Sequence, residues 1–369
     1  MLGHRPTPCS TPFQPLAACL SSLKTLPKFL DLFRDHAGPA GTMTFAHFMQ
    51  LALYDPSLGY YRQPRRLVGR APGTDFFTAS SSPLFGELVA AACASLLAAH
   101  HAHPRYFTFV EIGAEPFDYG SGEPGRTAQG RPMDGVLANT PHPFGATKTF
   151  RLGDPLELNG RSVVFSNELF DAQPFHRFVF RRGAWRELGV ALRDDVLVEI
   201  ELAETTPATL PITAPEGPAP SPVEGYCIDA PLEAATLAGQ IAAQPWSGLF
   251  LAFDYGKTWT ELAEATPAGT ARAYFRHAQS NDLLARPGEQ DLTCHVCWDW
   301  LADALARHGF AAPQVESQES FFVHHAADYL ASATAAEAGR FSEKKLSLLQ
   351  LLHPSHLGQK FQALWAWRS

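Results

Sequence analysis

Acidic and amide side chains follow two apolar runs, and their types and positions suit them to chemistry. Asn167 and Glu168 come directly after the run at 162–166, and Asp254 follows the run at 249–253. Polar groups at the end of a buried strand are costly unless they are hydrogen-bonded. The oxygens of these side chains could therefore accept hydrogen bonds from a ligand amine or from a guanidinium group. The alternative is that they only cap the turns that follow the strands.

A glycine turn is a further candidate for ligand binding. Glu111 lies near the end of the apolar run at 107–112, and Gly113 directly follows that run. A strand that ends in glycine lets the backbone approach a nucleotide-like ligand closely. The signal is weak by itself, because Glu115 and Pro116 occupy positions where further glycines would help. A plain strand-to-loop turn explains the segment equally well.

The spacing of cysteines and histidines predicts no metal site. Cys294 and Cys297 flank His295, but no second ligand pair follows at the spacing of zinc fingers or ribbons. This segment leads into an amphipathic stretch, where cysteine is usually a small core residue. The 15 histidines are scattered, and pairs such as His324 and His325 are expected on solvated faces.

The elements that must position these residues alternate between short strands and helices. Strands are predicted near 107–112, 162–166 and 249–254, because each run is short and apolar. Apolar residues at helical spacing predict helices over 45–53, 83–101, 232–244, 296–307 and 344–364, the last with a break at Pro354. Polar residues just past the strand ends then indicate an open α/β sheet with its ligand crevice at the carboxyl ends of the strands.

The remaining segments are predicted to lie around this core. Residues 1–29 are interpreted as a flexible N-terminal extension, and residues 30–369 as one domain. Within that domain, about 177–230 is interpreted as an insertion that contains a hairpin around Arg182 and Gly183.

Composition excludes some classes of function. The chain has 369 residues and a net charge of -8, which argues against non-specific nucleic-acid binding and against a polybasic membrane anchor. No apolar run approaches the roughly 20 residues of a membrane-spanning helix. The six cysteines are irregularly spaced, which favours a reducing compartment over a disulfide framework. We predict a cytoplasmic protein; the alternative is a mitochondrial one, if the acid-free first 30 residues are a transit peptide.

Five blocks of sequence resemble, in the same order, the MidA-like family of S-adenosylmethionine-dependent methyltransferases. They run from about residue 40 to residue 365. The blocks are Thr44–Met49 with Tyr54–Tyr61, Thr74–Thr78 with Pro83–Glu87, Asn167–Pro174, Pro287–Thr293, and Leu352–Pro354 with Leu357–Gly358. Each block is modestly specific, and the five in order are strong evidence.

The resemblance implies a class I methyltransferase fold, an α/β protein with a seven-stranded Rossmann-like sheet. It implies helices on both faces of the sheet, an N-terminal helical extension and an inserted β element. It also implies S-adenosyl-L-methionine as cofactor. The residues that the resemblance places beside this cofactor are Glu111, Gly113, Asp154 and Asn167.

By the same resemblance, Glu168, Asp171 and Asp254 are acids that lie near a substrate guanidinium. The mitochondrial members of the family methylate an arginine of a respiratory complex I subunit, so the implied partner is a protein substrate. An acid can align the nucleophilic nitrogen and take up its charge, and proximity supplies much of the rate. The oligomeric state is left open.

One departure from the family pattern keeps two hypotheses open. The family's glycine-rich loop is expected after Gly113, but this chain continues with Ala114, Glu115 and Pro116, and no long helix is predicted between 113 and 150. The first hypothesis is an enzyme that methylates a protein arginine. The second is a catalytically degenerate member that binds a partner protein without using the cofactor. We place the enzyme first, because the block that begins at Asn167 is intact.

Overall fold

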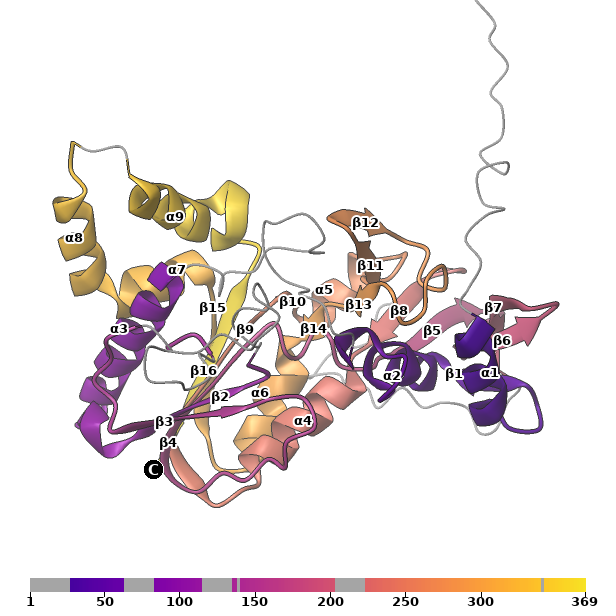
Figure 1. The fold of residues 1–369 in the computed structure, drawn as a ribbon, viewed down its shortest axis with the longest axis horizontal. Helices are drawn as coiled ribbons and strands as arrows, with labels where there is room; N and C mark the ends of the chain where they lie inside the picture. The colour runs from indigo at the N-terminus through magenta and orange to yellow at the C-terminus, as the bar shows by residue number, and fades with distance from the viewer. Residues whose placement is uncertain (1–26, 63–82, 115–134, 138–139, 203–222, 340–341) are drawn as a thin grey trace, which may run out of the picture.

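A six-stranded sheet forms the centre of the molecule in a computed structural model that describes residues 27–62, 83–114, 135–137, 140–202, 223–339 and 342–369 (Figure 1). Its strand order is β15-β16-β9-β4-β2-β3. The strands are β2 (Thr108–Ile112), β3 (Ala146–Phe150), β4 (Gly160–Asn167), β9 (Trp246–Asp254), β15 (Ala311–Ser317) and β16 (Gln362–Arg368). β3, β2, β4 and β9 run parallel, whereas β16 is antiparallel to both of its neighbours. The expected α/β sheet is therefore confirmed, with six strands in the described ranges where the resemblance implied seven.

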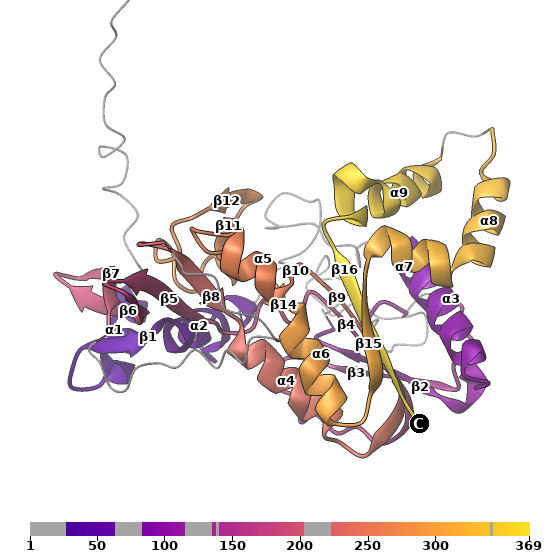
Figure 2. The same cartoon turned by 180° about the vertical axis from the view of Figure 1, so that it is seen from behind.

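Helices cover both faces of this sheet because its strands are apolar on both sides. In β9, Leu249, Leu251 and Phe253 belong to one core cluster, while Phe250 and Ala252 belong to another. Such continuous burial is typical of parallel strands covered on both faces. The helices on the first face are α3 (Pro83–Ala99), α7 (Gln318–His325), α8 (Ala327–Ala336) and α9 (Glu343–Leu352) (Figure 1). The helices on the second face are α4 (Leu232–Ala242) and α6 (Trp298–Arg307), seen from behind in Figure 2.

The C-terminal segment corrects one prediction. The helix expected over 344–364 ends at Leu352, and Gln362–Arg368 forms strand β16 between β9 and β15. Trp365 and Trp367 are partly buried on one side, and Leu364 and Ala366 are fully buried on the other. This alternation has the period of a strand, and pairing on both edges outweighs any helical preference of the apolar residues.

Strand β3 was missing from the sequence prediction. It lies at the edge of the sheet, where only its last residue, Phe150, is buried. Ala146, Thr147 and Lys148 are exposed, so the segment has no apolar pattern that would reveal a strand. Its pairing with β2 holds it in place.

A second, antiparallel sheet lies beside the first (Figure 1). Its order is β1-β6-β5-β8, with β7 also paired to β6. The hairpin predicted around Arg182 and Gly183 joins β5 to β6 and is confirmed. The strands are β1 (Thr42–Thr44), β5 (His176–Arg181), β6 (Ala184–Arg193), β7 (Val196–Glu201) and β8 (Cys227–Ala230). The helices α1 (Pro27–His36) and α2 (Phe45–Tyr54) share a core cluster with this sheet, and the side chain of Thr44 caps α2 as expected.

Smaller elements lie between the two sheets (Figure 1). They are β10 (Gly256–Lys257), α5 (Trp259–Glu264), β11 (Arg272–Phe275), β12 (Ala278–Ser280), β13 (Asp291–Thr293) and β14 (Val296–Cys297). Cys294 and Cys297 are buried here as core residues, in agreement with the sequence interpretation. Within the described ranges, none of the helices has the length and apolar character needed to span a bilayer.

Candidate functional site

The carboxyl ends of β2, β4 and β9 bring the predicted site residues to one edge of the central sheet. Ile112 pairs with Ser166, and Asn167 pairs with Phe253. The backbone N–H of Glu168 donates to the carbonyl of Phe253 at 2.9 Å. This register places the glycine turn after β2, the acidic turn after β4 and the end of β9 next to one another.

Asp254 holds the turn after β4 in place. Its side chain is fully buried, and its Oδ2 accepts hydrogen bonds from the backbone N–H groups of Phe170 (2.8 Å) and Asp171 (3.3 Å). Its Oδ1 accepts from the N–H of Tyr255 at 2.9 Å. Three backbone donors compensate part of the cost of burying this carboxylate. Asp254 therefore orients the turn that presents Asp171.

Asp171 and Asp254 form a buried pair of carboxyl groups that interact electrostatically. Burial raises the pKa of Asp171 well above its usual range, and the nearby charges of Asp254, Glu168 and Asp291 raise it further. Burial raises the pKa of Asp254 to about 7, although its backbone donors act in the opposite direction. Because like charges at close range oppose ionisation of both groups, the pair retains a proton near neutral pH.

Two tyrosines and a fourth acid complete this cluster, and sequence reasoning assigned them no role. The Tyr61 hydroxyl donates to Oδ1 of Asp291 at 2.8 Å, and the Tyr54 hydroxyl donates to the carbonyl of Ala172 at 2.7 Å. The two rings stack, with centroids 5.5 Å apart and planes at 25°. Burial, and then the charge of Asp291, raises the pKa of both phenols, so they act as neutral donors. Tyr54, Tyr61 and Asp291 all lie in sequence blocks that carry the family resemblance. Their place in these blocks is the sequence signal that could have identified them.

Glu168 faces the same space in a strained backbone conformation. Its φ is +51°, in the left-handed region that non-glycine residues seldom adopt. Its Oε1 accepts a hydrogen bond from Nδ2 of Asn167 at 3.0 Å. Burial raises the pKa of Tyr255, and the charges of Glu168 and Asp171 raise it further, which places this third phenol beside the acids. Acids surrounded by aromatic rings are an environment that suits a planar cation.

The turn after β2 is built on Gly113. Its φ is +78°, and a Cβ added there would lie 3.0 Å from Cδ1 of Leu169. The N–H groups of Gly113 and Ala114 donate to the carbonyl of Phe150 at 2.9 and 3.2 Å. The turn therefore requires glycine both for its backbone angle and for the space beside Leu169.

Asn167 offers a buried hydrogen-bond acceptor at this edge. Its Oδ1 is buried and has no hydrogen-bond partner among the residues that the structure describes. Leaving such an oxygen unpaired costs roughly 1–3 kcal/mol, so a ligand donor would stabilise it. Together with the tight turn at Gly113, this acceptor fits a cofactor that carries amino and hydroxyl groups.

The other two predicted cofactor residues are bound to the protein backbone. Glu111 is buried, and its Oε2 accepts a hydrogen bond from the N–H of Val136 at 2.6 Å. Asp154 lies in the turn after β3, where its Oδ2 accepts from the N–H of Arg151 at 2.7 Å. Their roles toward a cofactor stay predictions. The predictions for 1–26, for Thr74–Thr78, and for Glu115 and Pro116 concern residues outside the described ranges.

Known proteins are similar to this chain in sequence and in fold. The model of a family described as "Putative S-adenosyl-L-methionine-dependent methyltransferase" matches residues 148–315. The zebrafish (Danio rerio) protein named protein arginine methyltransferase NDUFAF7, mitochondrial, is 25% identical over 363 residues, which cover 87% of this chain and 82% of the relative. Its homolog in Drosophila melanogaster is 27% identical over 307 residues, covering 69% of this chain and 65% of the relative.

Two crystal structures from Burkholderia thailandensis share the fold. One, bound to S-adenosyl-homocysteine, has a TM-score of 0.74 and 23% identity, and the match covers 97% of this chain and 95% of that one. The other, a native structure of an uncharacterised protein, has a TM-score of 0.71 and 22% identity with the same coverage. The resemblance drawn from the sequence is thereby confirmed. Over residues 148–315 the chain is similar to this family of S-adenosyl-L-methionine-dependent methyltransferases, and the NDUFAF7 proteins are distant relatives.

Proposed function

We propose that this protein transfers a methyl group from S-adenosyl-L-methionine to an arginine side chain of a protein substrate. The observation that carries the proposal is the buried pair of Asp171 and Asp254, which lies beside Glu168 and three tyrosines at the carboxyl edge of the sheet. The names of the two NDUFAF7 relatives, which call them protein arginine methyltransferases, support the choice of substrate.

The fit of the chain to the cofactor rests on two features. The backbone turns sharply at Gly113, beside Leu169, and Oδ1 of Asn167 is a buried acceptor that has no partner among the described residues. The cofactor, when bound, supplies an electrophilic methyl group on a sulfonium. The structural neighbour solved with S-adenosyl-homocysteine supports a cofactor of this type.

The acids account for the chemistry that the protein itself must perform. A guanidinium is protonated at all physiological pH values, and its nitrogen must lose a proton during methyl transfer. In the proposed step the nitrogen–carbon bond forms as the sulfur–carbon bond breaks, and the electron pair of the broken bond stays on sulfur. Asp171 and Glu168 orient the nitrogen through hydrogen bonds, and a carboxylate accepts the released proton.

Asp254 has a different role in this proposal from the one first expected of it. Because its oxygens accept from three backbone N–H groups, it acts as a positioning residue for Asp171 and does not contact the substrate. The carboxyl groups of Asp254 and Asp171 also exchange a proton, so the two groups titrate as a unit.

Transfer of an isotopically labelled methyl group tests the proposal. The full chain is incubated with labelled S-adenosyl-L-methionine and a set of arginine-containing peptides, and the modified residue is found by mass spectrometry. We expect label on arginine, lost in Asp171→Asn and kept in Asp303→Asn, which removes an exposed acid paired with Arg307 on α6. Label on another residue type, or equal transfer by Asp171→Asn, would contradict the proposed role of the acid cluster.

A further inference from the structure

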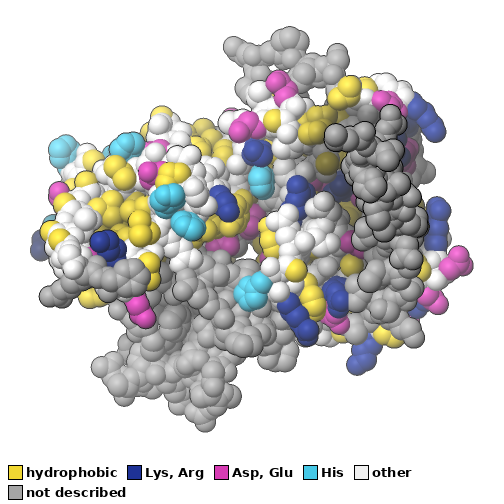
Figure 3. Space-filling view, turned by 90° about the horizontal axis from the view of Figure 1, so that it is seen from above, with side chains coloured by type: hydrophobic (Ala, Val, Ile, Leu, Met, Phe, Trp, Pro, Cys, Tyr) yellow, Lys and Arg dark blue, Asp and Glu magenta, His cyan; other side chains and the backbone are white. Residues whose placement is uncertain are grey.

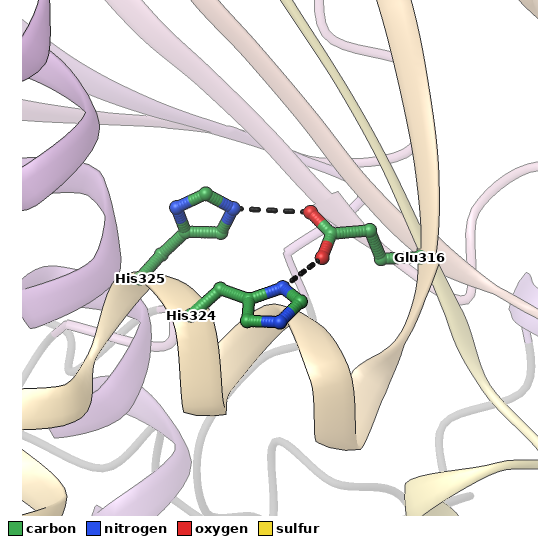
Figure 4. Close-up of side chains that lie close together, drawn as sticks. All are labelled: Glu316, His324 and His325. Carbon is green, nitrogen blue, oxygen red and sulfur yellow. Dashed lines mark hydrogen bonds and ion pairs between the residues drawn. The ribbon is translucent and has the colours of Figure 1, made fainter.

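Two histidines and a glutamate converge between α7 and β15 (Figure 4). His324 and His325 end α7, and Glu316 lies near the end of β15. Nδ1 of His324 is 2.5 Å from Oε2 of Glu316, and Nε2 of His325 is 3.0 Å from Oε1. We call these three residues the His–Glu cluster.

The cluster is held by its surroundings rather than by chance contact of mobile side chains. Nε1 of Trp365 donates to Oε1 of Glu316 at 2.9 Å, which fixes the carboxylate. The ring of His325 lies between the rings of Phe321 and Trp365, with centroids at 4.9 and 5.2 Å. The side chains of Glu316 and His325 are each only 19% exposed, so their positions are defined by packing.

One side of the cluster is open to solvent. The side chain of His324 is 61% exposed, in contrast to its two partners. Figure 3 shows histidine side chains scattered over the half of the upper face that the C-terminal helices build. Within the described part of the chain, the His–Glu cluster is the group in which three such ligand atoms all lie within 4.8 Å of one another.

We propose that the His–Glu cluster binds a divalent transition-metal ion, with Zn²⁺ as the best fit. Two imidazole nitrogens and one carboxylate oxygen are ligands that Zn²⁺ takes, and the exposed side leaves a position for water. With metal–ligand distances near 2.1 Å, tetrahedral ligands lie about 3.4 Å apart. Nδ1 of His324 and Nε2 of His325 lie 2.5 and 3.0 Å from different oxygens of Glu316, so each nitrogen–oxygen pair needs to separate by about 1 Å or less.

The hydrogen bond from Trp365 supports this assignment. Residues that ligate a metal are usually oriented by such an outer partner, and losing one typically weakens binding 10–100-fold. The sequence interpretation placed His324 and His325 on a solvated face, where such histidine pairs more often lie; the third ligand, Glu316, comes from β15. The bound ion would link β15 to the end of α7.

Titration of the full chain with Zn²⁺ alone tests the site. The variants are His324→Ala and Glu316→Gln, and the control is Glu319→Gln, which changes a half-buried acid on the same helix as His324. The six cysteines are the same in every protein, so differences between proteins isolate the His–Glu cluster. We expect one Zn²⁺ equivalent to bind the parent chain and the control. The Zn²⁺ affinity of the two variants should be at least about 100-fold lower.

Thermal melting of the same four proteins provides the second measurement. Zn²⁺ should raise the melting temperature of the parent and the control but not of the two variants. Because protons compete for imidazole nitrogens, the same Zn²⁺ affinity should fall on acidification. Zn²⁺ binding that is equal in all four proteins, or absent from the parent, would overturn the site and leave the cluster as a hydrogen-bonded trio.

Discussion

The backbone N–H of Asp171 donates to Oδ2 of Asp254 at 3.3 Å, although the two residues are 83 positions apart in the chain. Burial raises the pKa of the Asp171 carboxyl group, and the charge of Asp254 raises it further. One acid is thus positioned by another that comes from a neighbouring strand. This relationship makes the pKa of the pair, the orientation of the turn and the proposed chemistry depend on one another.

The pH dependence of the reaction follows from this pair. Burial raises the pKa of Asp254 to about 7, and below that value the pair keeps a proton that opposes binding of a cation. We expect kcat/KM for an arginine peptide to rise as the pH rises through about 7, and this inflection to be absent from Asp171→Asn. The measurement is a pH–rate profile of both proteins. A flat profile for the parent chain would contradict the shared proton.

Folding stability should depend on pH in the opposite direction. Burial raises the pKa of each acid in the folded protein. At pH values between the unfolded-state pKa and the folded-state pKa, the folded protein therefore binds more protons than the unfolded protein. The free energy of unfolding contributed by the pair therefore falls as the pH rises from about 4 toward about 7. Denaturant unfolding across this range should show a smaller fall for Asp171→Asn than for the parent. If the free energy of unfolding falls equally in both proteins, the pH dependence comes from other groups.

Replacing Asp171 should separate activity from stability. Asp171→Asn removes one of two buried, mutually repelling carboxyl groups, so we expect its melting temperature at pH 8 to match or exceed that of the parent. Methyl transfer should fall about 10²–10⁴-fold, as is usual when a proton-accepting group is lost. If activity and melting temperature fall together, Asp171 has a structural role only.

Gly113 should be required for cofactor binding beyond its effect on stability. Gly113→Ala adds a Cβ at a φ of +78°, 3.0 Å from Leu169. Gly183→Ala is the matched control, because its φ is +75° and its Cβ would meet nothing within 4 Å. Each change should cost about 1–2 kcal/mol through backbone strain. Only Gly113→Ala should weaken binding of S-adenosyl-homocysteine; equal affinities in the two variants would remove Gly113 from the cofactor site.

Tyr61 should support the site through its hydroxyl. Tyr61→Phe keeps the ring stacked on Tyr54 but removes the donor to the buried Asp291. The backbone N–H of Leu292 still donates to the same oxygen at 2.9 Å. We expect a loss of about 1 kcal/mol of stability and a rise in KM for the arginine peptide, with cofactor affinity unchanged. An unchanged KM would confine Tyr61 to a packing role.

The parts of the fold that sequence could predict are those with a clear burial pattern. β2, β4 and β9 are buried on both faces, so their apolar runs are visible in the sequence. β3 lies at the edge with one buried residue, and β16 has apolar residues on both faces beside a helix of similar composition. For these two strands, pairing with neighbours decides the structure, and that pairing depends on contacts distant in the chain.

The site was predictable in its residue types but not in its roles. Glu168, Asp171 and Asp254 follow buried strands, and the parallel register brings them together as expected. Asp254 accepts hydrogen bonds from three backbone N–H groups, and Tyr61 donates to Asp291, which is 230 positions away in the chain. Both contacts depend on tertiary geometry, which the spacing of residues in the sequence does not encode.

The most direct test of the whole account is cofactor binding by the purified chain. Isothermal titration with S-adenosyl-L-methionine and S-adenosyl-homocysteine should give micromolar dissociation constants, about -8 kcal/mol of binding free energy. Both ligands should also raise the melting temperature. If neither ligand releases heat or stabilises the protein at millimolar concentration, the chain does not use this cofactor, and a fold retained for binding a partner protein would take the place of the methyltransferase.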